Sequence, residues 1–169
     1  GPDACWEEIN VATLSDGGAS YGWPSYEGFA QPNEPTPPAN YIDPVFAWQH
    51  DEGGAAAIGG LVYRGNLFPT QYQGAYFYSD LVSQTIEYIT FDANGNVIGG
   101  NSVANAASGG GTGGNTVFDT EVGAVVGFET GLDGAIYYLD VNKRGSIGKN
   151  RGAIKRITYS ATAGAAPTI

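Results

Sequence analysis

The stretch GAYFYSDLVSQTIEYITFD, residues 74–92, decides the fold because the chain repeats it. Residues 134–140, GAIYYLD, match its first seven residues at four of seven positions, at a spacing of 60. Residues 153–160, AIKRITYS, then resemble residues 85–92, TIEYITFD, at a spacing of 68. A third, partial copy begins the chain as WEEINV, residues 6–11. Self-similarity at a fixed period predicts a repeated supersecondary unit.

Each full copy holds an apolar strand, a tyrosine-rich strand and an alternating strand, and one copy adds a fourth. Four antiparallel strands in a repeated unit form the blade of a β-propeller. A blade packs on both faces, which accounts for apolar Ile86 on one face and apolar Ile89 and Phe91 on the other. The predicted fold is all-β, about two and a half to three blades of a propeller, with an irregular β-sandwich as the alternative. The predicted strands are 6–11, 44–48, 57–63, 74–80, 85–92, 116–120, 124–129, 135–140 and 153–160.

The predicted organisation is a partial blade at 1–50, a full blade at 51–120, a last blade at 121–160 and a linker or tail at 161–169. Within the full blade, AIGGLVY is apolar enough for a strand covered on both faces. Its Gly59 and Gly60 allow a close approach of another backbone.

An incomplete ring leaves two blade faces in contact with water. Propellers close with four to eight blades, and a monomer rarely exposes an apolar patch above a few hundred Å². We therefore expect the remaining propeller blades, a second chain or a symmetric copy to cover the open faces.

Composition excludes several classes of function. The net charge of −10 argues against nucleic acid as a partner, because phosphates are met by Lys and Arg. No apolar run is long enough to span a bilayer.

Methionine is absent, so Gly1 and Pro2 are expected to be a cleavage scar or native sequence exposed by processing. The single Cys5 is either a quiet thiol or half of a bridge to a partner outside this chain.

Two stretches offer candidate functional residues. Residues 21–28, YGWPSYEG, form either a packed loop whose rings cap the core or a ligand-stacking platform built from Tyr21, Trp23 and Tyr26. His50, the only histidine, is followed by two carboxylates, which suggests a metal ligand or a general base. A lone histidine supplies no ligand set, so a structural role is the alternative.

Two further stretches have a structural and a functional interpretation. The Asn-Gly pair after residue 93 predicts a hairpin turn that resembles a calcium loop but lacks its later ligands. Six of the seven basic residues lie between Lys143 and Arg156, in a solvated hairpin or, alternatively, a specific anion site.

Seven segments together resemble the C-terminal half of the soluble glucose/sorbosone dehydrogenase family, which includes pyrroloquinoline-quinone-dependent aldose sugar dehydrogenases and hedgehog-interacting-protein-like relatives. The resemblance covers nearly all of residues 1–160. It implies a six-bladed propeller, periplasmic or extracellular, with calcium supporting the fold and the quinone. In catalytic members the quinone takes a hydride from the sugar, with a histidine as base. The segments are WEEIN, YGWPSYEG, IGGLVYRG, FP, YQGAYFYSD, LDGAIYYLD and IKRITY.

Most catalytic features of the family do not carry over. Its catalytic histidine lies in an earlier blade, and His50, ahead of IGGLVYRG, does not match it. At the position where the family brings a lysine to the quinone, this chain has LVSQ, residues 81–84. At the position where the family uses arginines, this chain has AVVG, residues 124–127. A tricarboxylate quinone without those cations would leave anionic groups unpaired. Binding of pyrroloquinoline quinone by this chain alone is therefore not expected.

The resemblance implies calcium more directly, because Gly1, Pro2, Glu7 and Glu8 resemble the region near the metal positions of the family. The predicted function is a segment of a secreted sugar-dehydrogenase-like propeller, catalytically silent alone and serving as a scaffold or binding module. One alternative is an active quinone-dependent sugar oxidoreductase completed by missing blades, with Tyr21, Trp23, Tyr26 and His50 lining a sugar channel. A purely structural extracellular building block is the other.

Overall fold

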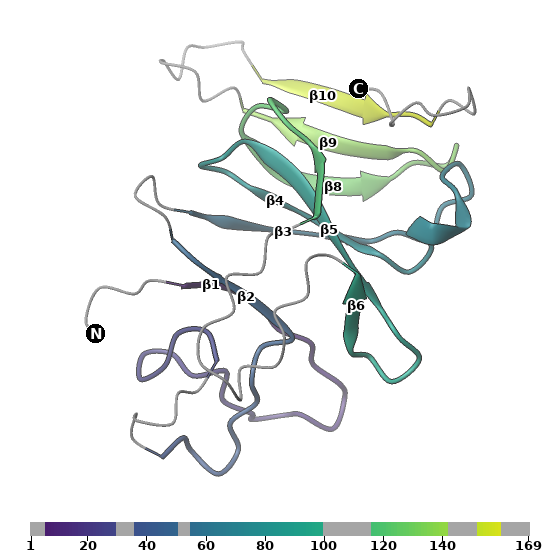
Figure 1. The fold of residues 1–169 in the computed structure, drawn as a ribbon. Coiled ribbons are helices and arrows are strands. Elements are labelled where there is room, and N and C mark those ends of the chain that lie inside the picture. The colour runs from purple at the N-terminus through teal and green to yellow at the C-terminus, as the bar shows by residue number, and fades with distance from the viewer. Residues whose placement is uncertain (1–5, 30–35, 51–54, 100–115, 142–151, 160–169) are drawn as a thin grey trace.

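The computed structural model describes residues 6–29, 36–50, 55–99, 116–141 and 152–159, and within them the protein is built from antiparallel β-sheets. Three sheets follow one another in chain order and lie side by side (Figure 1). The first blade holds β1 (Trp6–Ile9) and β2 (Phe46–Gln49). The middle blade holds β3 (Ala57–Val62), β4 (Tyr76–Asp80), β5 (Thr85–Phe91), β6 (Val97–Gly99) and β7 (Thr116–Asp119). The last blade holds β8 (Val125–Thr130), β9 (Ile136–Asp140) and β10 (Ala153–Ile157).

The repeat read from the sequence is present in the register of the strands. In the middle blade, Tyr78 on β4 lies opposite Glu87 on β5. In the last blade, Tyr138 on β9 lies opposite Lys155 on β10. The spacings of 60 and 68 residues therefore relate positions that are equivalent in space.

The middle blade is buried on both faces, as predicted for a blade. Side chains at alternate positions of a strand point to opposite faces. Towards the last blade, Phe77 and Ile86 pack with Ile136, Tyr138 and Ile157. Towards the first blade, Tyr78 and Ile89 pack with Ile9, Phe46 and Trp48, and Phe91 lies against this cluster. The fold is thus a partial β-propeller of three successive sheets, and the alternative of an irregular β-sandwich is wrong.

β3 is covered less completely than predicted: Leu61 lies against the cluster shared with the last blade and Ala57 against the cluster shared with the first, but both are only partly buried and Val62 is exposed. β3 is the first strand of its sheet and has β4 as a hydrogen-bonded neighbour on one side. It also lies alongside β8 of the last blade. The close backbone approach is confirmed at Gly60, where a Cβ atom would collide with the carbonyl group of Phe77.

The turn after β5 is confirmed as an Asn-Gly hairpin. The Asp92 carboxylate accepts hydrogen bonds from the backbone N–H groups of Asn94 at 2.8 Å and Asn96 at 2.9 Å, and Gly95 has a φ of 84°. The carboxylate thereby closes its own turn. The turn leads into β6, a short strand that the sequence pattern did not indicate.

Within the described residues, no helix has the length and apolar character needed to cross a membrane. Cys5, residues 161–169, where a linker or tail is predicted, and the basic residues from Lys143 to Arg151 lie outside those residues. Lys155 and Arg156 are described, and each pairs with an aspartate.

Candidate functional site

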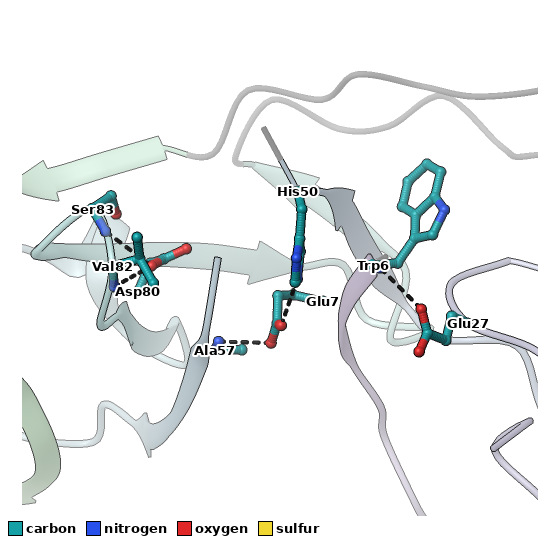
Figure 2. A network of polar contacts seen from close by, with 8 residues as sticks. All are labelled: Trp6, Glu7, Glu27, His50, Ala57, Asp80, Val82 and Ser83. Atoms are coloured by element: carbon teal, nitrogen blue, oxygen red, sulfur yellow. Dashed lines mark hydrogen bonds and ion pairs between the residues drawn. The ribbon is translucent and has the colours of Figure 1, made fainter. Parts of the chain in front are cut away.

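A polar cluster lies where the first blade meets the middle blade, centred on Glu7 and His50. Nε2 of His50 lies 2.8 Å from Oε1 of Glu7, and Oε2 of Glu7 accepts a hydrogen bond of 2.7 Å from the backbone N–H of Ala57. Figure 2 shows the imidazole directed at the carboxylate, with Ala57 on the other side of it. The carboxylate of Glu7 thus ties β1 to the end of β2 and the start of β3.

The contacts of Glu7 define the hydrogen-bonding state of His50. A carboxylate accepts hydrogen bonds, so the hydrogen in this contact is assigned to Nε2 of His50. The exposed fractions of the two side chains are 27% for His50 and 22% for Glu7. The pair is therefore oriented by the protein and still accessible to water.

Glu8 points away from this cluster, because neighbouring residues of a strand face opposite sides. Its Oε1 accepts a hydrogen bond of 2.9 Å from Nδ2 of Asn10, and its Oε2 one of 3.0 Å from the backbone N–H of Gly28. Glu7 and Glu8 therefore do not fit a common calcium site. In the part of the chain that the structure describes, no three His, Cys, Asp or Glu side chains gather to hold a metal ion. Gly1 and Pro2 lie outside that part, and the calcium prediction stays a prediction.

The stretch at 81–84 forms a tight turn at the end of β4. Oδ1 of Asp80 accepts hydrogen bonds from the backbone N–H groups of Val82 at 2.7 Å and Ser83 at 3.1 Å (Figure 2). The stretch at 124–127 leads into β8, and the backbone N–H of Ala124 donates a hydrogen bond to Asp140. Neither stretch presents a side chain that could neutralise the carboxylates of a quinone.

A hydroxyl chain leads from the same turn into the blade interface. Oγ of Ser83 lies 2.8 Å from Oγ1 of Thr85, and Oγ1 of Thr85 donates a hydrogen bond of 2.8 Å to Oε1 of Glu87. Ser83 is exposed, whereas Thr85 and Glu87 are buried. Burial, followed by the negative charge of Glu87, raises the pKa of the Tyr78 phenol far above its usual range.

Sequence reasoning missed the buried carboxyl groups of Asp80 and Glu87. The repeat could have indicated Glu87, because another charged residue, Lys155, stands at the same position of the last blade.

The aromatic residues of the first loop take different roles. Tyr26 is buried, with its ring centroid 5.5 Å from that of Tyr41, whereas Tyr21 is half-buried and Trp23 is 77% exposed. All three lie on the connection between β1 and β2, whereas His50 follows the other end of β2. The loop therefore combines a packed residue with an exposed tryptophan.

The outer face of the last blade is a second surface with functional potential. Ile154 is 73% exposed, although Ile86, at the equivalent position of the middle blade, is completely buried. Leu139 on the same face is 48% exposed. A hollow of about 380 Å³ lies over this face and is lined by Gly127, Phe128, Glu129, Tyr137, Leu139 and Ile154, among others.

Comparison with known proteins places these features in a family context. The sequence pattern described as "Glucose / Sorbosone dehydrogenase" matches residues 3–149. The fold is similar to a glucose dehydrogenase crystal structure, with a TM-score of 0.53 and 16% identity over 85% of this chain. It is also similar to a putative oxidoreductase of Thermus thermophilus, described as a glucose dehydrogenase, with a TM-score of 0.56 and 20% identity over 90% of this chain. The chain spans 36% of the length of each. No curated protein sequence matches it.

Proposed function

This chain belongs to the glucose/sorbosone dehydrogenase family, and we propose that it forms part of a secreted sugar-dehydrogenase-like β-propeller, extracellular or periplasmic. In that propeller it acts as a scaffold or binding module and does not catalyse sugar oxidation by itself. The proposal rests on the open face of the last blade, on the length of the chain relative to similar structures, and on the side chains at 81–84 and 124–127.

The open face of the last blade is the observation that carries the proposal. In the middle blade, the face that bears Ile86 is covered by the last blade. The equivalent face of the last blade leaves Ile154 and Leu139 exposed. Because exposed apolar sheet faces mark interaction surfaces, this face supports a role as one section of a larger stack of blades. The remaining blades of a longer polypeptide are the proposed cover.

The poor fit between the quinone and the described residues supports the proposal that this chain alone does not catalyse sugar oxidation. Pyrroloquinoline quinone supplies hydride acceptance when it is bound, and its carboxylates need cationic partners. The residues at 81–84 and 124–127 are apolar or neutral, and the described residues do not fit the quinone. The described part of the chain contributes Arg64, Lys155 and Arg156 as basic residues, of which Lys155 and Arg156 already pair with aspartates.

The test is a dye-reduction assay with this chain, pyrroloquinoline quinone, calcium and glucose. We expect no sugar-dependent reduction above a control without quinone, and turnover by this chain alone would contradict the proposal. Light scattering over a range of concentrations tests whether a second copy of the chain covers the open face of the last blade. A mass that doubles with concentration would point to a symmetric copy in place of further blades.

A second candidate is an active quinone-dependent sugar oxidoreductase that missing blades complete. The contact between Glu7 and His50 favours it, because a histidine oriented by a carboxylate suits binding of a hydroxyl group. A longer polypeptide that oxidises sugars, and loses affinity for them on His50→Gln, would support this candidate.

A further inference from the structure

The turn between β5 and β6 contains the one Asn-Gly pair of the sequence, Asn94-Gly95. Both residues are exposed. An exposed asparagine readily loses its side-chain amide when glycine follows it, because glycine has no side chain to shield its backbone nitrogen. The pair is therefore a candidate site of covalent modification.

The reaction at such a pair needs only water. The backbone nitrogen of Gly95 loses its proton and attacks Cγ of Asn94, so that a new C–N bond closes a five-membered succinimide ring. The C–N bond of the side-chain amide breaks, and its nitrogen leaves with a proton as ammonia. Water then opens the ring at either carbonyl group, which gives aspartate or isoaspartate at position 94. One water molecule is consumed, one ammonia is released, and no group is oxidised or reduced.

The folded turn restrains both reacting groups through Asp92. The backbone N–H of Gly95, which carries the attacking nitrogen, donates a hydrogen bond of 3.1 Å to the carbonyl oxygen of Asp92. Oδ1 of Asp92 accepts hydrogen bonds from the backbone N–H groups of Asn94 at 2.8 Å and Asn96 at 2.9 Å. Its Oδ2 accepts one of 2.9 Å from Nδ2 of Asn96. The turn therefore has to open before the ring can close.

Asp92 is well suited to hold the turn because its carboxyl group is ionised at neutral pH. Hydrogen bonds from Asn96, followed by those from Asn94, lower the pKa of this carboxyl group. An ionised carboxylate accepts hydrogen bonds at both of its oxygens. Asp92 thus keeps its contacts under the conditions in which asparagine loses its amide.

We propose that Asn94 is a site of spontaneous deamidation through a succinimide with Gly95, and that the contacts of Asp92 slow the reaction by holding the turn closed. This inference is independent of the proposed function, since it concerns a covalent change within one turn and not the oxidation of a sugar.

The modification weakens the attachment of β6 to the middle blade. β6 pairs with β5 through Phe91 and Val97, and both side chains lie against the cluster between the first and middle blades. Isoaspartate adds a methylene group to the backbone of the turn, and both products place a second carboxylate close to Asp92. A longer backbone and a pair of like charges both disfavour the closed turn. The product should therefore hold β6 less firmly.

Peptide mapping by mass spectrometry tests the proposal on the folded protein, incubated in mildly alkaline buffer. The peptide that contains Asn94 should gain about one dalton with time and separate into aspartate and isoaspartate forms. Asn10 is the control within the chain, because it is exposed and the β-branched side chain of Val11 shields the next nitrogen. Asn10 should stay unmodified over the same period. No mass gain at Asn94, or an equal gain at Asn10, would overturn the proposal.

Three variants separate the roles of Asn94 and Asp92. Asn94→Gln should abolish the mass gain, because a six-membered ring would have to form and does so far more slowly. Asp92→Ala should speed the gain about fivefold, the factor that corresponds to about 1 kcal/mol of turn stability. Asp92→Asn retains a hydrogen-bond acceptor and should react more slowly than Asp92→Ala. Equal rates in Asp92→Ala and the unaltered protein would overturn the role of Asp92.

Two measurements on the unaltered chain do not depend on these variants. Urea opens the turn, so Asn94 should deamidate at least about fivefold faster in the denatured chain than in the folded protein. Equal rates in the two states would contradict protection by the turn. Hydrogen exchange of the fully modified protein should show lower protection of β6 and unchanged protection of β9. Unchanged protection of β6 would contradict the expected effect on the middle blade.

Discussion

The phenol oxygen of Tyr63 donates a hydrogen bond of 2.6 Å to the carbonyl oxygen of Gly134 and joins the middle blade to the last blade across 71 residues of sequence. The same oxygen accepts hydrogen bonds of 3.0 Å from the backbone N–H groups of Leu67 and Phe68. Tyr63 is completely buried. One hydroxyl group thus satisfies three backbone groups at the contact between two blades, where water does not replace it.

Tyr63→Phe should destabilise the protein by about 1–3 kcal/mol, because it leaves buried backbone groups without their hydrogen-bond partner. Urea denaturation measures the loss. Tyr137→Phe is the matched control, since the Tyr137 hydroxyl donates a hydrogen bond to Asp133 on an exposed surface. The control should change stability by less than about 0.5 kcal/mol. Equal effects of the two variants on stability would show that the buried hydroxyl group contributes no more than the exposed one.

Gly60→Ala should destabilise the middle blade, whereas Gly59→Ala should be tolerated. A Cβ atom at Gly60 would meet the backbone of Phe77 on β4, and one at Gly59 meets nothing within 4 Å. Forcing β3 away from β4 should cost about 1–3 kcal/mol, measured by thermal denaturation. Similar melting temperatures of the two variants would contradict the close approach.

Arg156→Gln should raise the pKa of Asp133 towards its ordinary value. The guanidinium group of Arg156 lies 2.7 Å from Oδ2 of Asp133, and this hydrogen bond, with that of Ala135, lowers the pKa of the carboxyl group. A lowered pKa in the folded state contributes stability that is present above the ordinary aspartate range and lost as pH falls through the lowered value. Side-chain NMR titration measures the shift. Asp92, whose pKa is lowered by Asn96, should titrate unchanged.

Glu7→Ala should change the hydrogen-bonding state of the His50 ring and weaken the attachment of the first blade to the middle blade. It removes the acceptor of Nε2 of His50 and of the Ala57 N–H. The site is half-buried, so we expect a loss of about 0.5–1.5 kcal/mol by thermal denaturation. Nitrogen NMR should show the Nε2–H form of His50 in the unaltered protein and a mixture of forms in the variant. Glu129→Ala serves as the exposed control, and an unchanged His50 spectrum in Glu7→Ala would refute the contact.

The strands and their repetition could be predicted from the sequence because they depend on local patterns. Alternating apolar positions identified Ile86 and Ile89 as belonging to opposite faces, and both are buried there. The Asn-Gly turn after Asp92 depends on backbone conformation within four residues and was predicted for the same reason.

The candidate site could be predicted only in part, because Glu7 lies on β1 and His50 follows β2, two paired strands that a long connection separates in sequence. The sequence indicated Glu7, Glu8 and His50 as candidates but grouped Glu7 with Glu8. The structure brings Glu7 to His50, which is 43 residues away, and turns Glu8 towards Gly28. Alternation along a strand separates neighbouring side chains, and only the pairing of β1 with β2 decides that Glu7 meets His50.

By itself, the sequence determined that the chain is a series of blades, because period-two alternation and turn residues encode strands locally. Only the tertiary structure decided what each face meets. Ile86 and Ile154 occupy the same position of the repeat, yet one is completely buried and the other is 73% exposed. The physical reason is that a strand's pattern states which side chains share a face, whereas burial and charge compensation depend on the neighbouring sheet that covers it.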